Sequence, residues 1–250
     1  MTQHFVVIGA QRSGTTYLRT LLEAHPDVAM NQPARPEPKV FLSAELTERG
    51  LDWYRSTYFA HVTTETVLGE KSTSYIECPE AADRVSETLG QDTAVIMLLR
   101  DPVERAVSNW RFSFDNGFEE RPLEQALREN LRASRPWIPG VTSVSPYLYL
   151  ERGRYATYLP PWTAAFPHGV HLLFLQDLVD EKQALADVFT RLGVDAGFVP
   201  SCWGTPANRS LEHAPELEPQ FVDELRAYFA DSDEQLAKLV GAPVPWPSHS

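Results

Sequence analysis

Residues 5–22, which read FVVIGAQRSGTTYLRTLL, decide the fold predicted for this chain of 250 residues. The segment opens with a β-branched apolar run, breaks at Gly9, and regains apolar residues at helical spacing from Leu18. This order predicts a buried strand, a loop and a helix. Glycines let a backbone turn tightly with its N–H groups bare, and a helix N-terminus adds partial positive charge at the same point. The segment therefore predicts an anion-binding loop.

The loop lacks the lysine of nucleotide triphosphatases. The Walker pattern G-x-x-x-x-G-K-[ST] requires a lysine where this chain has Thr15. A cation, Arg12, stands earlier in the loop, and the hydroxyls of Thr15 and Thr16 follow Gly14. Taken alone, a strand, loop and helix with two glycines is also compatible with a purely structural turn, so the later motifs have to decide.

Composition excludes several classes of function. The chain has 22 basic and 34 acidic residues, a net charge of -12, which argues against a nucleic-acid-binding protein but leaves room for a local basic pocket. No apolar run approaches the roughly 20 residues of a membrane span, and the N-terminus has no charged leader. Cys78 and Cys202 form no metal-binding spacing. We expect one soluble, cytoplasmic domain over residues 1–250.

Further strands and helices alternate along the chain. Apolar runs predict strands at 28–30, 66–70, 94–99 and 171–175. Helical patterns follow them, and the chain is expected to end in two helices, at 219–228 and 233–240. Asp177, just after the last strand, is expected to cap a helix. The alternation predicts an α/β fold with a parallel sheet.

Charged residues stand at the ends of two of these regions. In the proline-rich segment 31–42, the prolines forbid helix and favour an extended backbone, in which Glu37 and Lys39 are expected to face the same side. Lys71 follows the strand at 66–70, at the kind of strand end where open α/β sheets collect ligands. Each of these charges taken alone is equally compatible with a solvated surface.

A second strand, turn and helix occupies residues 98–110, which read LLRDPVERAVSNW. Asp101 as N-cap, Pro102 at the first helical position and Glu104 at the third predict a helix start. Arg100 stands at the end of the strand, and the planar fork of arginine suits a phosphate. Arg105 is equally compatible with a structural ion pair.

These motifs resemble those of the sulfotransferases that use 3′-phosphoadenosine 5′-phosphosulfate (PAPS), in the branch of heparan sulfate-type and related bacterial enzymes. Residues 9–16 resemble the 5′-phosphosulfate loop, commonly K-x-G-T-T, with Arg12 in the place of the lysine. Residues 37–41 resemble E-x-[HK]-x-F, and 69–75 resemble G-E-K-[ST]-P-x-Y without its proline. Residues 100–108 resemble the 3′-phosphate segment, R-[DN]-P-x-x-R-x-x-S.

The resemblance implies a P-loop-like three-layer α/β/α fold with a short central parallel sheet. It implies PAPS as donor, adenosine 3′,5′-bisphosphate (PAP) as product, and no metal. Glu37 is the expected base, with Arg12, Lys71 and Lys39 as the other catalytic residues. The expected nucleotide-binding residues are Gln11, Arg12, Ser13, Gly14, Thr15, Thr16, Arg100, Ser108 and, in a loop that closes over the nucleotide, Arg209. That last loop departs from the usual K-G-R-x-H-P, with His213 displaced.

The expected acceptor is a hydroxyl of a small molecule, a glycan or a secondary metabolite, recognised by loops at 31–45 and 112–150. The scarcity of lysine, with abundant alanine and proline, hints at a bacterial source. The sequence leaves the oligomeric state open. One alternative is a P-loop small-molecule kinase, against which the missing Walker lysine argues. Another is a non-catalytic nucleotide-binding protein, which would have no reason to bring Glu37, Lys39 and Lys71 together.

Overall fold

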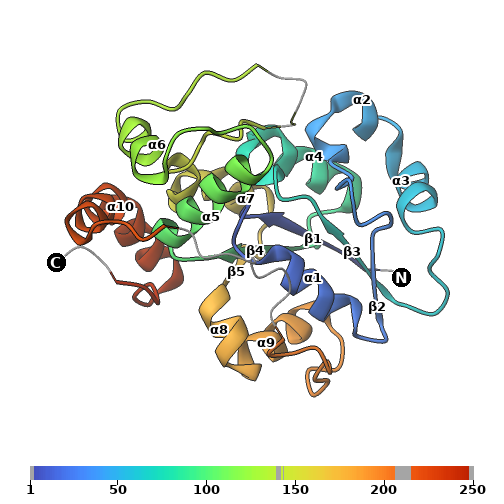
Figure 1. The fold of residues 1–250 in the computed structure, drawn as a ribbon. Coiled ribbons are helices and arrows are strands. Elements are labelled where there is room, and N and C mark those ends of the chain that lie inside the picture. Colours follow the sequence, from blue (N-terminus) through green and yellow to red (C-terminus); the bar gives the residue numbers. More distant parts are fainter. Residues whose placement is uncertain (1–2, 139–141, 143, 206–214, 248–250) are drawn as a thin grey trace. The chain divides into compact units, whose positions relative to one another are not determined.

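The computed structural model describes residues 3–138, 142, 144–205 and 215–247, shown in Figure 1. They divide into two compact units. The first unit contains residues 1–99 and 158–208, and the second contains residues 100–157 and 209–250. Among the residues that the structure describes, no helix has the length and apolar character needed to cross a membrane.

The first unit is built on a sheet of five parallel strands in the order β2-β3-β1-β4-β5. The strands are β1 (Gln3–Gly9), β2 (Val28–Met30), β3 (Val67–Lys71), β4 (Ala94–Leu99) and β5 (Val170–Phe174). The chain fills the sheet on one side of β1 and then on the other, so β1 lies at the point where the strand order reverses. Ligands of open α/β sheets bind at the carboxyl ends of the strands at such a point.

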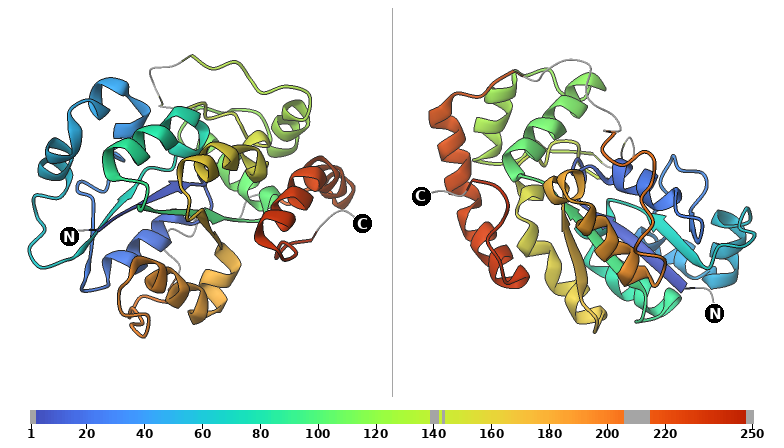
Figure 2. Two further views of the ribbon diagram at one scale, coloured as in Figure 1. Left: turned by 180° about the vertical axis from the view of Figure 1, so that it is seen from behind. Right: turned by 90° about the horizontal axis from the view of Figure 1, so that it is seen from below.

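Helices cover both faces of this sheet, which makes the three-layer α/β/α arrangement predicted above (Figures 1 and 2). One face is covered by α1 (Thr15–Glu23), α8 (Leu175–Asp180) and α9 (Lys182–Leu192). The other is covered by α4 (Pro79–Leu89) and α7 (Leu159–Ala165), and the unit also contains α2 (Ala44–Thr47) and α3 (Gly50–Tyr58). Side chains of β1 alternate between the faces, and Phe5 and Val7 pack against Leu18 and Leu22 of α1.

Gly69 in β3 makes room for this core. A Cβ added to Gly69 would lie 2.0 Å from Cζ of Phe5 on the neighbouring strand β1. Any larger residue would have to move a fully buried ring. The glycine of the G-E-K segment therefore has a packing role in addition to its place in the motif.

The second unit contains the helices α5 (Pro102–Asp115), α6 (Leu123–Asn130) and α10 (Pro219–Val240). Its core joins the apolar faces of these helices, with Trp110, Leu127 and Phe229 among the buried residues. Arg105 is fully buried and donates hydrogen bonds to the Tyr149 carbonyl and to Asn109. Both acceptors are neutral, so these contacts tie Arg105 into the second unit by hydrogen bonds and leave the expected ion pair a prediction.

Two predictions about helices are wrong. The pair expected at 219–228 and 233–240 is one continuous helix, α10. Ser232 and Asp233 in its middle are buried, and Trp246 Nε1 donates to Asp233 Oδ2 at 3.0 Å, which gives that carboxyl group a partner inside the unit. Asp177 is not a cap: α8 begins at Leu175, with Phe174 at its N-cap, and Asp177 lies inside its first turn.

Candidate active site

The loop predicted to bind an anion follows β1 directly. Gly14 takes the left-handed conformation, with φ 88°, and α1 begins at the next residue. At the other end of the loop, the Ala10 N–H donates to the Leu98 carbonyl of β4 at 2.8 Å. The first N–H groups of α1 have no intrahelical acceptor, as in any helix, and so remain available to a bound oxygen. Within the described residues, the buried Ser13 hydroxyl has no hydrogen-bond partner either. This donor set fits an anionic group.

The side chains of Gln11 and Arg12 are placed differently. The Gln11 amide donates to Ser74 Oγ at 3.3 Å and to Glu77 Oε1 at 3.1 Å, which ties the loop to the turn after β3. Arg12 is exposed and has a left-handed backbone, with φ 67°.

Gly14 could not be replaced easily, because an added Cβ would lie 2.6 Å from Leu175 Cδ1.

Glu37 and Lys71 are brought together, as the motifs led us to expect. The Lys71 ammonium forms an ion pair with Glu37 Oε1, and both side chains are mostly buried, with exposed fractions of 8% for Lys71 and 16% for Glu37. Thr73 donates to Glu37 Oε2 from its N–H at 3.0 Å and from its hydroxyl at 3.0 Å. The Lys71 ammonium and the two Thr73 donors together hold the Glu37 carboxyl group in one orientation.

A buried arginine that the sequence reading did not single out holds the start of the Glu37 loop. Arg19 of α1 donates to the Asn31 carbonyl at 2.7 Å and to Asn31 Oδ1 at 2.9 Å. Asn31 Oδ1 also accepts from the Lys71 N–H at 3.2 Å. Burial lowers the pKa of Arg19 below its usual value, against the opposing charges of Glu23 and Glu37. The position of Arg19, a charged residue on the apolar face of the first helix, is the sequence feature that could have predicted this role.

Lys39 corrects one prediction. The segment was expected to be extended, with Glu37 and Lys39 on the same side. Lys39 instead has a left-handed backbone, with φ 54°, so the alternation of an extended chain does not hold there. Its N–H donates to Ser72 Oγ at 2.9 Å. The cation paired with Glu37 is Lys71, the last residue of β3.

Arg100 and Ser108 belong to the second unit, on the helix start predicted at 98–110. Asp101 caps α5 by accepting from the N–H of Val103 at 2.8 Å, and it also accepts from both terminal nitrogens of Arg226, at 2.8 and 2.6 Å. The Arg100 guanidinium donates to Glu104 at 3.1 and 3.0 Å.

That ion pair is partly exposed, at 29% for Arg100 and 60% for Glu104, and exposed pairs contribute only about 0–1 kcal/mol. Arg100 can therefore exchange it for a phosphate at little cost. Ser108 is half-buried on α5. Arg209 and His213 lie outside the described residues.

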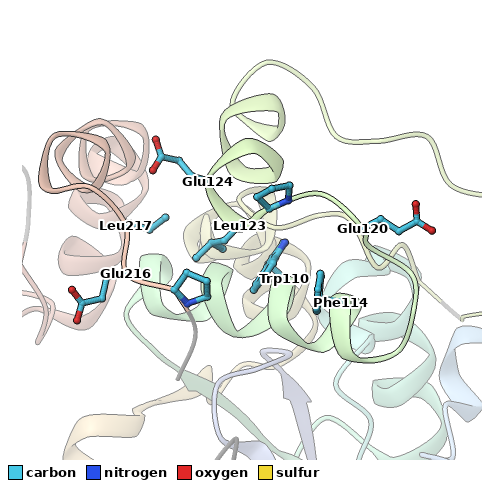
Figure 3. Close-up of a pocket in the computed structure, with 9 residues that line it drawn as sticks. Trp110, Phe114, Glu120, Leu123, Glu124, Glu216 and Leu217 are labelled. Carbon is cyan, nitrogen blue, oxygen red and sulfur yellow. The ribbon is translucent and has the colours of Figure 1, made fainter. Parts of the chain in front are cut away.

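The second unit also contains a mainly apolar pocket of about 500 Å³, part of it in the expected recognition loop at 112–150 (Figure 3). The rings of Trp110 and Phe114 stack in it with centroids 5.0 Å apart. Trp110 Nε1 is already used, since it donates to the Arg121 carbonyl at 3.0 Å. The pocket therefore offers apolar surface to a ligand. Its lining residues are Trp110, Phe114, Glu120, Pro122, Leu123, Glu124, Pro215, Glu216 and Leu217.

The parallel sheet and the loop at its reversal point define a P-loop-like α/β protein. Residues 2–182 match the model of the family described as Sulfotransferase domain, and the chain belongs to this family.

Relatives and a solved structure agree with that assignment. The chain is 25% identical to heparan sulfate glucosamine 3-O-sulfotransferase 3B1 of Mus musculus over 267 residues, which cover 96% of this chain and 64% of the relative. It is 32% identical to bifunctional heparan sulfate N-deacetylase/N-sulfotransferase 3 of Homo sapiens over 276 residues, which cover 96% of this chain and 30% of the relative. The chain thus spans less than two thirds of the length of either relative.

The crystal structure of a sulfotransferase from Alicyclobacillus acidocaldarius shares the fold. Its TM-score is 0.77 at 24% sequence identity, and the match covers 98% of both chains. The expected family and the expected fold class are confirmed.

Proposed function

We propose that the chain is an enzyme that transfers the sulfuryl group of PAPS to a hydroxyl of a small-molecule, glycan or secondary-metabolite acceptor. The observation that carries the proposal is the ion pair between Glu37 and Lys71, a carboxylate and an ammonium from separate motifs. Close to Lys71 in the chain, Ser74 accepts a hydrogen bond from Gln11 of the predicted anion-binding loop. A non-catalytic nucleotide-binding protein has no need for such a pair.

In the proposed mechanism, Glu37 accepts the proton of the acceptor hydroxyl as its oxygen attacks sulfur. The new oxygen–sulfur bond forms while the bond from sulfur to the bridging phosphate oxygen breaks, and PAP leaves with that electron pair. Proton removal by a positioned base contributes typically 10²–10⁴-fold in rate. An ammonium has three donors, so Lys71 can keep its bond to Glu37 and still donate to a sulfuryl oxygen.

The loop at 9–16 is the proposed site of the 5′-phosphosulfate. The N–H groups of Ser13, Gly14, Thr15 and Thr16 and the charge of Arg12 would stabilise negative charge on the bridging and sulfuryl oxygens, which is usually the largest catalytic effect. Gln11 is proposed to border this site. Arginine in the place of lysine keeps the charge but stays protonated, so Arg12 acts in this mechanism as a fixed charge and not as an acid.

The remaining expected residues complete the proposal. Arg100 and Ser108 would bind the 3′-phosphate, Arg209 would belong to a loop over the nucleotide, and Lys39 would add a second cation near the acceptor. The loops at 31–45 and 112–150 would recognise the acceptor. We also propose that residues 1–250 act as one sulfotransferase domain in the cytoplasm and need no metal.

Two measurements test this function. Titration calorimetry with PAP should show tight binding, and labelled PAPS with a panel of hydroxyl acceptors should give a sulfated product. A small-molecule kinase would instead be stabilised by ATP and magnesium in a thermal-shift assay, more than by PAP. Absence of PAP binding overturns the proposal.

A further inference from the structure

A buried carboxylate lies behind the proposed base, on the same strand as Lys71. Glu70 is fully buried in β3 and accepts hydrogen bonds from three hydroxyls, those of Tyr54, Ser72 and Tyr75. The Tyr54 bond to Oε2 measures 2.7 Å. Successive side chains of a strand point to opposite faces, so Glu70 and Lys71 leave β3 in opposite directions.

Two of these hydroxyls also hold the segment that carries Glu37. Ser72 Oγ accepts from the Lys39 N–H at 2.9 Å, and the Tyr75 hydroxyl oxygen accepts from the Phe41 N–H at 3.2 Å. Each hydroxyl has a single proton. Because that proton is donated to Glu70, the oxygen is left to accept from the backbone. As the acceptor of both hydroxyl protons, Glu70 thus sets the direction of both hydrogen bonds.

We propose that Glu70 is a positioning residue for the base: through Ser72 and Tyr75 it fixes the backbone at residues 39–41, and thereby the orientation of Glu37 against Lys71 and Thr73. This inference rests on the proposed role of Glu37. Two neighbouring residues of β3 then orient the Glu37 side chain, Lys71 directly through the ion pair and Glu70 indirectly through Ser72 and Tyr75.

The conformation of Lys39 is the reason why such an anchor is needed. Its backbone is left-handed, with φ 54°, a conformation that residues with side chains rarely adopt. A strained turn of this kind persists only where its surroundings hold it, and the Ser72 bond is made by the N–H of Lys39 itself. Without that bond, the chain two residues after Glu37 is free to relax to a right-handed or extended form, which would turn the Glu37 side chain.

The carboxylate is also costly in its position. Burial raises the pKa of Glu70, and the three hydroxyl donors oppose that rise. A well-packed apolar residue would avoid the desolvation that a buried charge requires. The presence of a carboxyl group here is therefore explained by the direction that it imposes on the Ser72 and Tyr75 hydroxyls and not by a gain in stability.

The test compares variants that alter the hydrogen bonds to the backbone of residues 39–41 with a variant that leaves those bonds in place. Glu70→Gln and the double variant Ser72→Ala/Tyr75→Phe disturb the anchoring. Tyr54→Phe is the matched control, because it removes a hydroxyl donor from Glu70 but keeps the ring that packs against Phe41. Turnover of PAPS, the Kd for PAP and the Tm are measured for each full-length variant.

We expect Glu70→Gln and the double variant to lower kcat about 10-fold or more, since small misplacements of a reacting group carry costs of that order. The Kd for PAP should stay within about twofold, because loop 9–16 is not touched. Tyr54→Phe should keep kcat within about threefold even where its Tm falls. Wild-type kcat in the double variant, or an equal loss in Tyr54→Phe, overturns the inference. If Glu70→Gln does not fold, the double variant decides.

A second measurement separates positioning from mere structure. In a Glu37→Gln background, Ser72→Ala/Tyr75→Phe should cause no further loss of kcat, because the group that it positions is already absent. Losses that multiply overturn the inference. A Glu37→Gln variant with full turnover overturns the role of Glu37 as base and the positioning role with it, whereas an inactive Glu37→Gln beside a fully active Glu70→Gln overturns the positioning role alone. Absence of PAP binding overturns the proposed function itself.

Discussion

Thr73 donates two hydrogen bonds to the Glu37 carboxylate, one from its backbone N–H and one from its hydroxyl, both at 3.0 Å to Oε2. The residue that orients the proposed base is therefore two positions after the lysine that neutralises it. Thr73→Val removes only the hydroxyl bond, and we expect kcat to fall about tenfold because the carboxylate gains freedom to rotate. Thr73→Ser keeps the hydroxyl and should retain most of the activity. Equal turnover in the two variants would contradict this role.

Glu37→Gln should lower kcat about 100-fold or more, since an amide cannot accept the hydroxyl proton. The Kd for PAP, measured by calorimetry, should change little. Glu48→Gln is a suitable control, because Glu48 is an exposed carboxylate at the end of helix α2 and lies outside the proposed recognition loop at 31–45. Full turnover in Glu37→Gln would show that another group removes the proton.

Arg100→Ala should weaken PAP binding strongly, because it removes a planar, charged phosphate ligand. Glu104→Ala breaks the same ion pair from the other side and leaves the arginine in place. It should therefore keep or improve PAP affinity and change the free energy of unfolding by less than about 1 kcal/mol. Calorimetry on both variants checks the prediction, and matching losses of affinity would argue that the pair itself is what matters.

Gly14→Ala should lower the free energy of unfolding by about 2 kcal/mol or more. The substitution meets two penalties, a left-handed backbone and a Cβ 2.6 Å from Leu175 Cδ1. Gly117→Ala is the control, since Gly117 has φ +73° with nothing within 4 Å of an added Cβ, so only the backbone penalty of about 1 kcal/mol remains. Urea unfolding measures both, and Gly14→Ala should also weaken PAP binding where Gly117→Ala does not.

Asp233 predicts a dependence of stability on pH. Burial raises the pKa of its carboxyl from 3.8 to about 6, against the opposing effects of the Trp246 hydrogen bond and the Arg226 charge. The folded state therefore holds this proton more tightly than the unfolded state, and the free energy of unfolding falls as pH rises between those two values. Asp233→Asn removes that dependence while keeping an acceptor for Trp246.

Relative to wild type, Asp233→Asn should be stabilised by about 1–3 kcal/mol more at pH 8 than at pH 4. Urea unfolding of both proteins at the two pH values checks this difference. An unchanged difference between the proteins at the two pH values would mean that Asp233 ionises normally in the folded state.

Much of the fold was predictable because buried parallel strands appear in the sequence as continuous runs of apolar residues. The run at 94–99 coincides with β4, and the strand predicted at 171–175 is β5 with its bounds shifted by one residue. The continuous helix α10 was not predictable from the local pattern, because its polar residues 231–233 are typical of a break between two helices. The hydrogen bond from Trp246 to Asp233 is a tertiary contact that the local pattern does not contain. Tertiary contacts there override the local signal.

The site was predictable only in part, for a similar reason. Motif spacing was enough to bring Glu37 and Lys71 together. The contributions of Thr73 and Glu70 depend on which side chains meet across the fold, and no spacing in the chain encodes that choice. The left-handed turn at Lys39 was missed because a proline-rich segment favours an extended backbone everywhere except where hydrogen bonds hold it otherwise.

The place of β1 in the middle of the sheet has a consequence for hydrogen exchange. β1 is paired with β3 on one edge and with β4 on the other, so its amides open only when the sheet itself comes apart. The Ser13 N–H in the loop after it donates to the Ala10 carbonyl at 3.3 Å, whereas the first N–H groups of α1 have no intrahelical acceptor. PAP should therefore slow exchange at residues 14–16 by a large factor, while the amides of β1, a few residues earlier, follow the global unfolding of the first unit.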